Sequence, residues 1–159
     1  MNFYLHDTRE VFRANYFDVV LNLFSSFGYY DKERDNIRSI IANSTALKAE
    51  GFFVFDYINA VNVRKQGEKN YTKEIENITF NIHEYIDGNF IKNKVSFHAD
   101  GTDYTFMEQL YLLDKIQIEG YFKKCGLMVT NFFGNYQLES FDTEKSERLI
   151  LTAKKINQR

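Results

Sequence analysis

The sequence has no proline and only one cysteine among its 159 residues. At an average usage of about 5%, roughly eight prolines would be expected in a chain of this length. One cysteine cannot build a disulfide framework or a cysteine-based zinc site. Neither sign of charge is in large excess, because the 20 Lys and Arg residues nearly balance the 22 Asp and Glu residues, for a net charge of −2. The charge balance therefore gives no reason to expect a nucleic acid or a membrane surface as a partner.

Long hydrophobic runs are missing as well. No segment approaches the roughly 20 apolar residues of a membrane span. The N-terminal residues MNFYLHDTRE have neither the basic region nor the apolar core of a targeting signal, so we expect a cytoplasmic protein. With 44% hydrophobic and 26% charged residues, the composition excludes a disordered polymer. The length suits one domain spanning 1–159.

The first third of the chain alternates between strands and a helix. A short apolar start at 2–5 precedes a nearly continuous apolar run at 16–23, which predicts a strand buried on both faces. Apolar residues at helical spacing predict an amphipathic helix over 32–48, with Asp31 as its N-cap. Residues 52–57 predict a second buried strand. A strand, a helix and a strand within about 40 residues predict a βαβ crossover with parallel strands.

The middle of the chain has a different pattern. Apolar and polar residues alternate over 75–86 and 90–98, and a third run follows at 104–112. Asp-Gly dipeptides separate the three runs, as in antiparallel hairpins. We therefore expect residues 74–112 to form an inserted antiparallel β-meander.

The last third returns to the alternation of helix and strand. Residues 114–125 predict a helix capped by its first residue, with Ile116 and Ile118 facing inward. Strands are expected at 127–133 and 148–153. The whole pattern predicts an α/β fold with a mainly parallel sheet and the antiparallel meander as an addition.

Residues that commonly carry chemistry are sparse. His6, His83 and His98 lack the spacing of metal ligands, so we expect no metal site. Cys125 ends an apolar helix with no base placed beside it and is expected to be a small buried hydrophobe. The serines at 25–26 are not in a G-x-S-x-G elbow, and the sequence contains no phosphate-binding loop.

The more informative residues follow the predicted parallel strands, because open α/β sheets bind ligands at that edge. Three such segments are 6–9, 22–26 and 56–59. An aspartate after a strand can accept a hydrogen bond from an exocyclic amine such as that of adenine, or it can cap a turn. The residue type alone favours neither. Asn59 can form a turn or bind a substrate, and by itself it leans toward the turn.

These segments resemble a known family. Residues 17–60, FDVVLNLFSSFGYYDKERDNIRSIIANSTALKAEGFFVFDYINA, are similar to the middle of a class I S-adenosylmethionine (SAM)-dependent methyltransferase. That family has Phe-Asp-x-Val in its fourth strand, then Ser-Phe-Gly-Tyr, a helix and Gly-Phe-x-x-x-Asp in its fifth strand. HDTREVF at 6–12 resembles the segment after the third strand, where Asp-x-Arg is common. Residues 115–150 resemble the closing helix, the last two strands and the Ser-x-Arg turn.

The resemblance implies SAM as cofactor and a role for each segment. Asp7 would bond the adenine amino group, and the other residues implied to contact the cofactor are Thr8, Asn22, Leu23 and Phe24. The residues implied to face the substrate are Ser25, Ser26, Phe27, Tyr29, Asp56, Tyr57, Asn59, Arg64 and Arg148. The meander at 74–112 would cover the site as a lid.

One element of the family is missing, because no Gly-x-Gly turn occurs in the sequence. In the family this turn approaches the methionine part of the cofactor, and an acid after the second strand holds the ribose. The chain starts at what resembles the end of the third strand, so we expect roughly 80–90 residues of the usual fold to be absent. The strand at 16–23 would then have an unpaired edge, which predicts a homodimer or an N-terminal partner chain.

Two functions follow from this comparison. The first is an enzyme that transfers a methyl group to a small-molecule acceptor, a reaction that depends mainly on positioning. Its candidate bases are Asp56, His98 and Tyr29, and the sequence selects none of them. The second is a non-catalytic remnant, a truncated form or half of a split enzyme, acting as a binding or dimerisation module. The missing glycine turn favours the second function.

Overall fold

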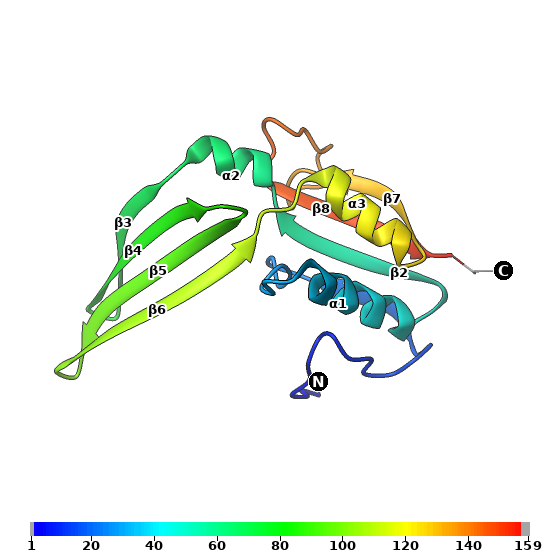
Figure 1. Ribbon diagram of the computed structural model, residues 1–159, viewed down its shortest axis with the longest axis horizontal. Helices are drawn as coiled ribbons and strands as arrows, with labels where there is room; N and C mark the ends of the chain where they lie inside the picture. The colour runs from blue at the N-terminus through cyan, green and yellow to red at the C-terminus, as the bar shows by residue number, and fades with distance from the viewer. Residues whose placement is uncertain (1, 157–159) are drawn as a thin grey trace.

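The computed structural model describes residues 2–156, which form two four-stranded sheets and three helices (Figure 1). In chain order the elements are β1 (Phe17–Asn22), α1 (Glu33–Ala46), β2 (Leu47–Ile58), α2 (Ala60–Gln66), β3 (Lys69–Ile75), β4 (Ile78–Asp87), β5 (Phe90–Ala99), β6 (Thr102–Tyr111), α3 (Lys115–Lys124), β7 (Leu127–Phe133) and β8 (Arg148–Lys155). In Figure 1, α1 and α3 lie against one sheet, and the other sheet extends away to the side.

The first sheet, which we call sheet A, has the strand order β1-β2-β8-β7. β1 and β2 pair in parallel, as the predicted βαβ crossover requires. β8 is antiparallel to both of its neighbours, because the chain turns back after β7 and inserts β8 between β7 and β2. Thus β1, β2 and β7 run in one direction, but only the β1–β2 pairing is parallel. The expectation of a mainly parallel sheet is not confirmed.

The helix α3 begins as its sequence predicts. The Asp114 carboxylate accepts a hydrogen bond from the Gln117 backbone N–H at 2.8 Å, and the Gln117 side chain accepts one from the Asp114 N–H at 3.0 Å, which completes a capping box. Ile118 is buried, whereas Ile116 is 80% exposed. The expectation that both face inward was wrong, since residues two apart on a helix point about 200° apart.

The start of α1 differs from its prediction. Lys32 is the N-cap residue and its side chain caps nothing, so Asp31 is not the cap. The Asp31 carboxylate instead accepts a hydrogen bond from the Gln109 side chain of β6. At the other end, Leu47 is already part of β2, and the helix therefore ends at Ala46, before the predicted residue 48.

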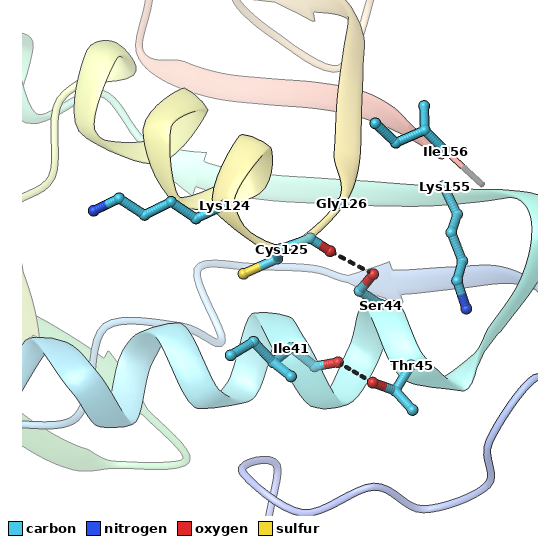
Figure 2. Close-up of a pocket in the computed structure, with 8 residues that line it drawn as sticks. All are labelled: Ile41, Ser44, Thr45, Lys124, Cys125, Gly126, Lys155 and Ile156. Carbon is cyan, nitrogen blue, oxygen red and sulfur yellow. Dashed lines mark hydrogen bonds between the residues drawn. The ribbon is translucent and has the colours of Figure 1, made fainter. Parts of the chain in front are cut away.

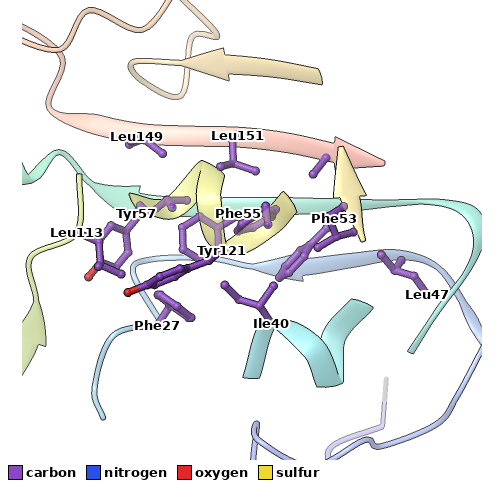
Figure 3. Packing of buried hydrophobic residues seen from close by; sticks show 14 residues of the cluster. Phe27, Ile40, Leu47, Phe53, Phe55, Tyr57, Leu113, Tyr121, Leu149 and Leu151 are labelled. Atoms are coloured by element: carbon purple, nitrogen blue, oxygen red, sulfur yellow. The ribbon is translucent and has the colours of Figure 1, made fainter. Parts of the chain in front are cut away.

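The hydrophobic core lies between sheet A and the two helices α1 and α3 (Figure 3). Alternate residues of β2, namely Phe53, Phe55 and Tyr57, are at most 1% exposed. The Phe55 ring packs edge-on against Phe122 of α3, with ring centroids 5.3 Å apart. The core is completed by residues from β8, α1, α3 and the loops, including Leu149, Leu151, Ile40, Tyr121, Leu113 and Phe27.

The other face of sheet A is open. Val19 lies beside Phe52 in the β1–β2 register. Val19, Leu21 and Phe52 are 49%, 58% and 43% exposed. The prediction that the strand at 16–23 is buried on both faces was therefore wrong, although Val20 packs against the core as expected. Most strands with a parallel neighbour are covered on both faces, so this face lacks the layer that such a sheet ordinarily has.

The second sheet, sheet B, has the order β3-β4-β5-β6 and is antiparallel throughout. It contains the predicted meander and one further strand, β3, which follows the unpredicted helix α2. The sequence of β3, KNYTKEI, has few apolar residues, and all seven residues of the strand are exposed. Pairing with β4, rather than its own pattern, makes it a strand. No residue of the four strands is fully buried.

The N-terminal segment folds back beside β1 without joining the sheet. Residues 2–5 form no strand, contrary to the expectation of a short apolar strand, and Leu5 is fully exposed. The rings of Tyr4 and Phe12 lie 4.9 Å apart, and Phe12 stacks on Phe17 of β1 at 6.4 Å.

Candidate functional site

The carboxyl ends of the parallel strands β1 and β2 lie side by side. Directly after β1, Phe24 and Ser25 have φ angles of 57° and 58°. Residues other than glycine rarely adopt this left-handed conformation, and strain of this kind is concentrated at functional sites. Asp56 of β2 holds both residues, because its carboxylate accepts a bond from the Phe24 N–H at 2.8 Å and its carbonyl accepts one from the Ser25 N–H at 3.1 Å.

Asp56 also forms a buried ion pair with Arg148 of β8. The carboxylate is 1% exposed, and one oxygen accepts bonds from Arg148 Nε at 2.8 Å and Nη2 at 2.6 Å. The second oxygen accepts the Tyr136 hydroxyl at 3.0 Å as well as the Phe24 N–H. Arg148 Nη2 donates further to Ser25 Oγ at 3.0 Å. This cluster ties β2, β8 and the segment after β1 into one rigid unit.

Gly28 joins this unit to sheet B. Its φ is +88°, and a Cβ atom there would lie 2.6 Å from the Tyr57 hydroxyl. The Gly28 carbonyl accepts a bond from the Tyr111 N–H at 2.8 Å, and the Tyr57 hydroxyl donates to the Tyr111 carbonyl. Only glycine fits between these groups, so Gly28 fixes the end of β6 against the end of β2.

Six of the implied site residues are exposed, and Asn22 and Leu23 are half-buried. The exposed ones are Asp7, Thr8, Phe24, Ser26, Tyr29 and Arg64. Phe24 and Tyr29 are 74% and 50% exposed. Asn22 donates from Nδ2 to the Ser26 carbonyl at 3.1 Å, but its Oδ1 is buried and has no hydrogen-bond partner within residues 2–156. A buried acceptor without a donor is costly and calls for a ligand or a water. Asn22 is therefore suited to accept a bond from a ligand at this edge.

The N-terminal segment brings Asp7 and Thr8 against Tyr30. Asp7 accepts four hydrogen bonds from Arg9, the shortest from Nη2 at 2.6 Å. These bonds hold the pKa of the Asp7 carboxyl well below its usual range, so the group is ionised. Thr8 Oγ1 and the Tyr30 hydroxyl are 2.9 Å apart. The Asp7 side chain keeps 41% of its surface exposed and can accept a further bond from a ligand.

The other implied residues are directed inward or bonded within the protein. Phe27 and Tyr57 belong to the core, at 4% and 0% exposure. Asn59 is 2% exposed and caps α2, and its amide also donates to two backbone carbonyls. Asn59 is therefore the N-cap residue of α2, with its side chain bonded within the protein. Arg64 is the exception, since it lies exposed on α2 and makes no ion pair within the described part of the chain.

None of the three candidate bases combines a free basic atom with a place at the carboxyl ends of β1 and β2. Asp56 is buried and fully hydrogen-bonded, as described above. Burial and the nearby Glu108 charge raise the pKa of Tyr29, so its phenol stays protonated. His98 bonds Asp103 at 2.7 Å near the far end of β5, roughly 26 Å along the strand from Phe90. The structure therefore assigns no catalytic base.

A cavity of about 270 Å³ separates sheet B from the end of sheet A. Tyr29 and Ile58 line it from one side, and Glu84, Asn93 and Glu108 line it from sheet B. The sequence analysis singled out only Tyr29 among these residues. The Asp-Gly turns could have revealed the three residues of sheet B, since a hairpin's turn determines which residues lie opposite one another.

A second hollow, of about 460 Å³, lies at the other end of sheet A and is shown in Figure 2. Its polar groups are bonded within the protein: Ser44 Oγ donates to the Cys125 carbonyl at 2.9 Å, and Lys155 Nζ donates to the Leu47 carbonyl at 2.6 Å. Burial raises the pKa of the Cys125 thiol to about 11. The thiol is therefore protonated at neutral pH and unsuited to act as a nucleophile.

Among the residues that the structure describes, no group of three His, Cys, Asp or Glu side chains could hold a metal ion. None of the helices in residues 2–156 is long and apolar enough to cross a membrane.

Comparison with known proteins identifies the fold. No protein-family profile and no curated protein sequence matches the chain. Among solved structures, a SAM-dependent methyltransferase from Clostridium acetobutylicum matches 97% of the chain with a TM-score of 0.85 and 18% identity. The CcbJ methyltransferase from Streptomyces caelestis matches 96% of the chain with a TM-score of 0.80 and 15% identity. SAM-bound CalS10, an amino pentose methyltransferase from Micromonospora echinaspora, matches 94% of the chain with a TM-score of 0.67 and 14% identity.

The chain therefore has the fold of a class I SAM-dependent methyltransferase. It spans 64%, 63% and 63% of the lengths of these three proteins.

Proposed function

We propose that this chain takes part in SAM-dependent methyl transfer to a small-molecule acceptor. The observation that carries the proposal is the unpaired Asn22 Oδ1 beside the strained residues Phe24 and Ser25, at the carboxyl ends of two parallel strands. Open α/β sheets bind ligands at this edge. The same fold in SAM-bound CalS10 supports SAM as the ligand.

The residues at this edge fit the nucleoside part of SAM. Asn22 Oδ1 is an unpaired acceptor and Asp7 is an ionised, partly exposed carboxylate. Amino and hydroxyl groups of a nucleoside can donate to both. Asp7, Thr8, Asn22, Leu23 and Phe24 would hold this part. Bound SAM would supply a methyl group on a positively charged sulfur. The 159 residues contain no Gly-x-Gly turn for the rest of the molecule.

The acceptor would lie between this edge and sheet B. Ser26 and Tyr29 are exposed toward solvent, and Ser25, Asp56 and Arg148 fix the shape of the segment that carries them. Residues 74–112 would cover the acceptor as a lid. Phe27, Tyr57 and Asn59 act through packing and capping, and we propose no substrate contact for them.

Calorimetric titration of the chain with SAM and S-adenosylhomocysteine tests the cofactor proposal. We expect micromolar binding that Asp7→Ala or Asn22→Ala weakens by about tenfold or more, since each removes one acceptor. Asp103→Ala, at a 91% exposed side chain far along sheet B, is the matched control and should bind as the unaltered chain does. The absence of binding at millimolar ligand would contradict the proposal.

That negative result would support the second function, a non-catalytic binding or dimerisation module or half of a split enzyme. The specific observation in its favour is that β1 ends sheet A with one edge unpaired in the described structure. The half of the cofactor site that a glycine turn supplies in the family would then have to come from other residues.

The edge of β1 supports a protein partner. β1 ends sheet A with one edge unpaired in the described structure, and Val19 and Leu21 expose an apolar face next to that edge. An unpaired edge is a template for another strand. For the isolated chain, a second copy can provide that strand through a symmetric β1–β1 contact.

Light scattering should therefore give twice the monomer mass of 18.9 kDa. Leu21→Lys should restore the monomer, whereas Ile116→Lys, at an exposed residue of α3, should not. A stable monomer would contradict the dimer and would leave the edge for a partner chain that carries the remaining part of the fold.

A further inference from the structure

A row of polar side chains crosses the middle of sheet B. Glu84 of β4 lies opposite Asn93 of β5, and Asn93 lies opposite Glu108 of β6. Opposite residues on adjacent strands share a face of the sheet. Lys69 of β3 lies opposite Glu84 at the outer end of the row, where its Nζ donates to Gln66. The part of the row that lines the cavity therefore presents two carboxylates with one amide between them. Two positions along, Ile91 and Leu110 lie opposite each other and make the same face apolar on one side of the row.

This row lines the cavity of about 270 Å³ between the two sheets. The wall opposite the row is formed by Tyr29 after β1, Ile58 at the end of β2 and Val63 of α2. A ligand in the cavity would thus lie beside the carboxyl ends of β1 and β2, next to the proposed cofactor edge. Its apolar part would contact Ile58, Val63 and Leu110.

The cavity offers negative charge and hydrogen-bond acceptors. No Lys or Arg is among the residues that line it. Glu84 accepts one bond, from the Tyr71 hydroxyl at 2.8 Å. Glu108 has no hydrogen bond or ion pair within residues 2–156, and Asn93 Oδ1 is a buried acceptor with no donor there. Such a cavity repels an anion and matches a positively charged group that carries several N–H donors.

A metal ion does not fit this arrangement. Glu84 and Glu108 are on strands separated by β5, so their backbones are about 9–10 Å apart. Calcium takes about 6–8 oxygen ligands and magnesium about six, whereas no group of three His, Cys, Asp or Glu side chains in the described residues could hold a metal ion. An organic ammonium group with an apolar body can bridge the two carboxylates at a longer range and fill the remaining volume.

We propose that the cavity between the two sheets binds the amino group of the methyl acceptor as an ammonium ion between Glu84 and Glu108. The ammonium ion gives up a proton to one of these carboxylates before methyl transfer, since only the neutral amine has the lone pair that accepts the methyl group. The acceptor is therefore a small amine with an apolar body, rather than a phenol, a carboxylate or a phosphate. That the bound amine is the methyl acceptor rests on the proposed function. Binding of the amine to the cavity does not require the cofactor.

The test is a nuclear magnetic resonance titration of the whole chain without SAM. Cyclohexylamine is the probe, and cyclohexanol and cyclohexanecarboxylate provide the same ring with no charge and with the opposite charge. We expect the amine to bind about tenfold more tightly than the alcohol, with shifts centred on the Asn93 side chain and the backbones of Glu84 and Glu108. Glu84→Gln and Glu108→Gln keep the shape of the side chain and should each weaken binding about fivefold or more.

Glu74→Gln removes one charge from an exposed position of β3 in the same sheet and is the matched control. It should leave the affinity unchanged, which separates the cavity from a general attraction to a negative surface. Equal binding of the three probes, shifts outside the cavity, or insensitivity to both cavity variants would overturn the proposal. Unchanged spectra of sheet A would confirm that the variants fold. If the chain binds the amine but not SAM, the methyl-transfer function is rejected and the amine site is kept. If the chain binds SAM but not the amine, only the amine site is rejected.

Discussion

Sheets A and B each have four strands, but what covers them differs. In sheet A, α1 and α3 cover one face, and Phe53, Phe55 and Leu151 beneath them are at most 1% exposed. In sheet B no strand residue is fully buried, and its aromatic pairs, such as Phe80 and Phe97 at 4.7 Å, are half-covered. Sheet A is thus stabilised by burial and sheet B mainly by strand pairing. The part of the fold with the weaker anchoring faces the proposed acceptor cavity, which agrees with the proposal that residues 74–112 act as a lid.

The largest expected difference between the sheets is the cost of removing an aromatic ring. Phe55→Ala should destabilise the fold by about 3–5 kcal/mol, because the ring is fully buried and its cavity cannot collapse. Phe97→Ala in sheet B should cost roughly 1–2 kcal/mol, because solvent reaches the site. Urea unfolding of both variants measures this, and equal losses would contradict the contrast.

The second-largest loss of stability is expected from breaking the Asp56–Arg148 ion pair. Arg148→Met leaves the Asp56 carboxylate buried without its cation and should cost about 3 kcal/mol, the low end for such pairs, since Arg148 is 21% exposed. Lys154 is on the same strand as Arg148 and forms a surface ion pair with Glu50. Lys154→Met removes this pair and should cost about 1 kcal/mol or less. Comparable unfolding midpoints for the two variants would show that the buried pair is not what holds the segment after β1.

A substitution at the junction tests how the sheets are joined. Gly28→Ala places a methyl group 2.6 Å from the Tyr57 hydroxyl at a positive φ and should cost about 2–3 kcal/mol. Gly101→Ala also has a positive φ, of +73°, but meets no atom within 4 Å, so about 1 kcal/mol is expected. Hydrogen exchange should accelerate at the sheet B end of the junction in the first variant alone. Protection of the Tyr111 amide in Gly28→Ala would count against the junction.

The smallest effect concerns the thiol at the rim of sheet A. With a pKa of about 11, Cys125 is about one part in a thousand thiolate at pH 8, so disulfide reagents should label it slowly and faster as pH rises toward 11. In a Cys125→Ser background, Thr105→Cys places a thiol on an exposed residue of β6 and should label much faster. Similar rates would indicate that the hollow around Cys125 is open to the reagent.

Several elements could be predicted from short stretches of sequence. The strand at Leu127–Phe133 and the capping box of α3 depend on neighbouring residues, and the Asp-Gly turns identify the β4–β5 and β5–β6 hairpins. The β3 strand was missed because its partner, rather than its own residues, makes it a strand. Of the site, the segment after β1 was predicted, but its arrangement around Asp56 was not.

By itself, the sequence determined the alternation of helices and strands, the hairpins of sheet B and the motifs that resemble a methyltransferase. These depend on residues within a few positions of one another. Only the tertiary structure decided that β8 inserts between β2 and β7, that one face of β1 stays exposed, and that Arg148 meets Asp56 across 92 positions of the chain. It also decided that the row of Glu84, Asn93 and Glu108 faces the end of sheet A. Such contacts depend on how distant segments pack once the chain has closed, which local periodicity does not encode.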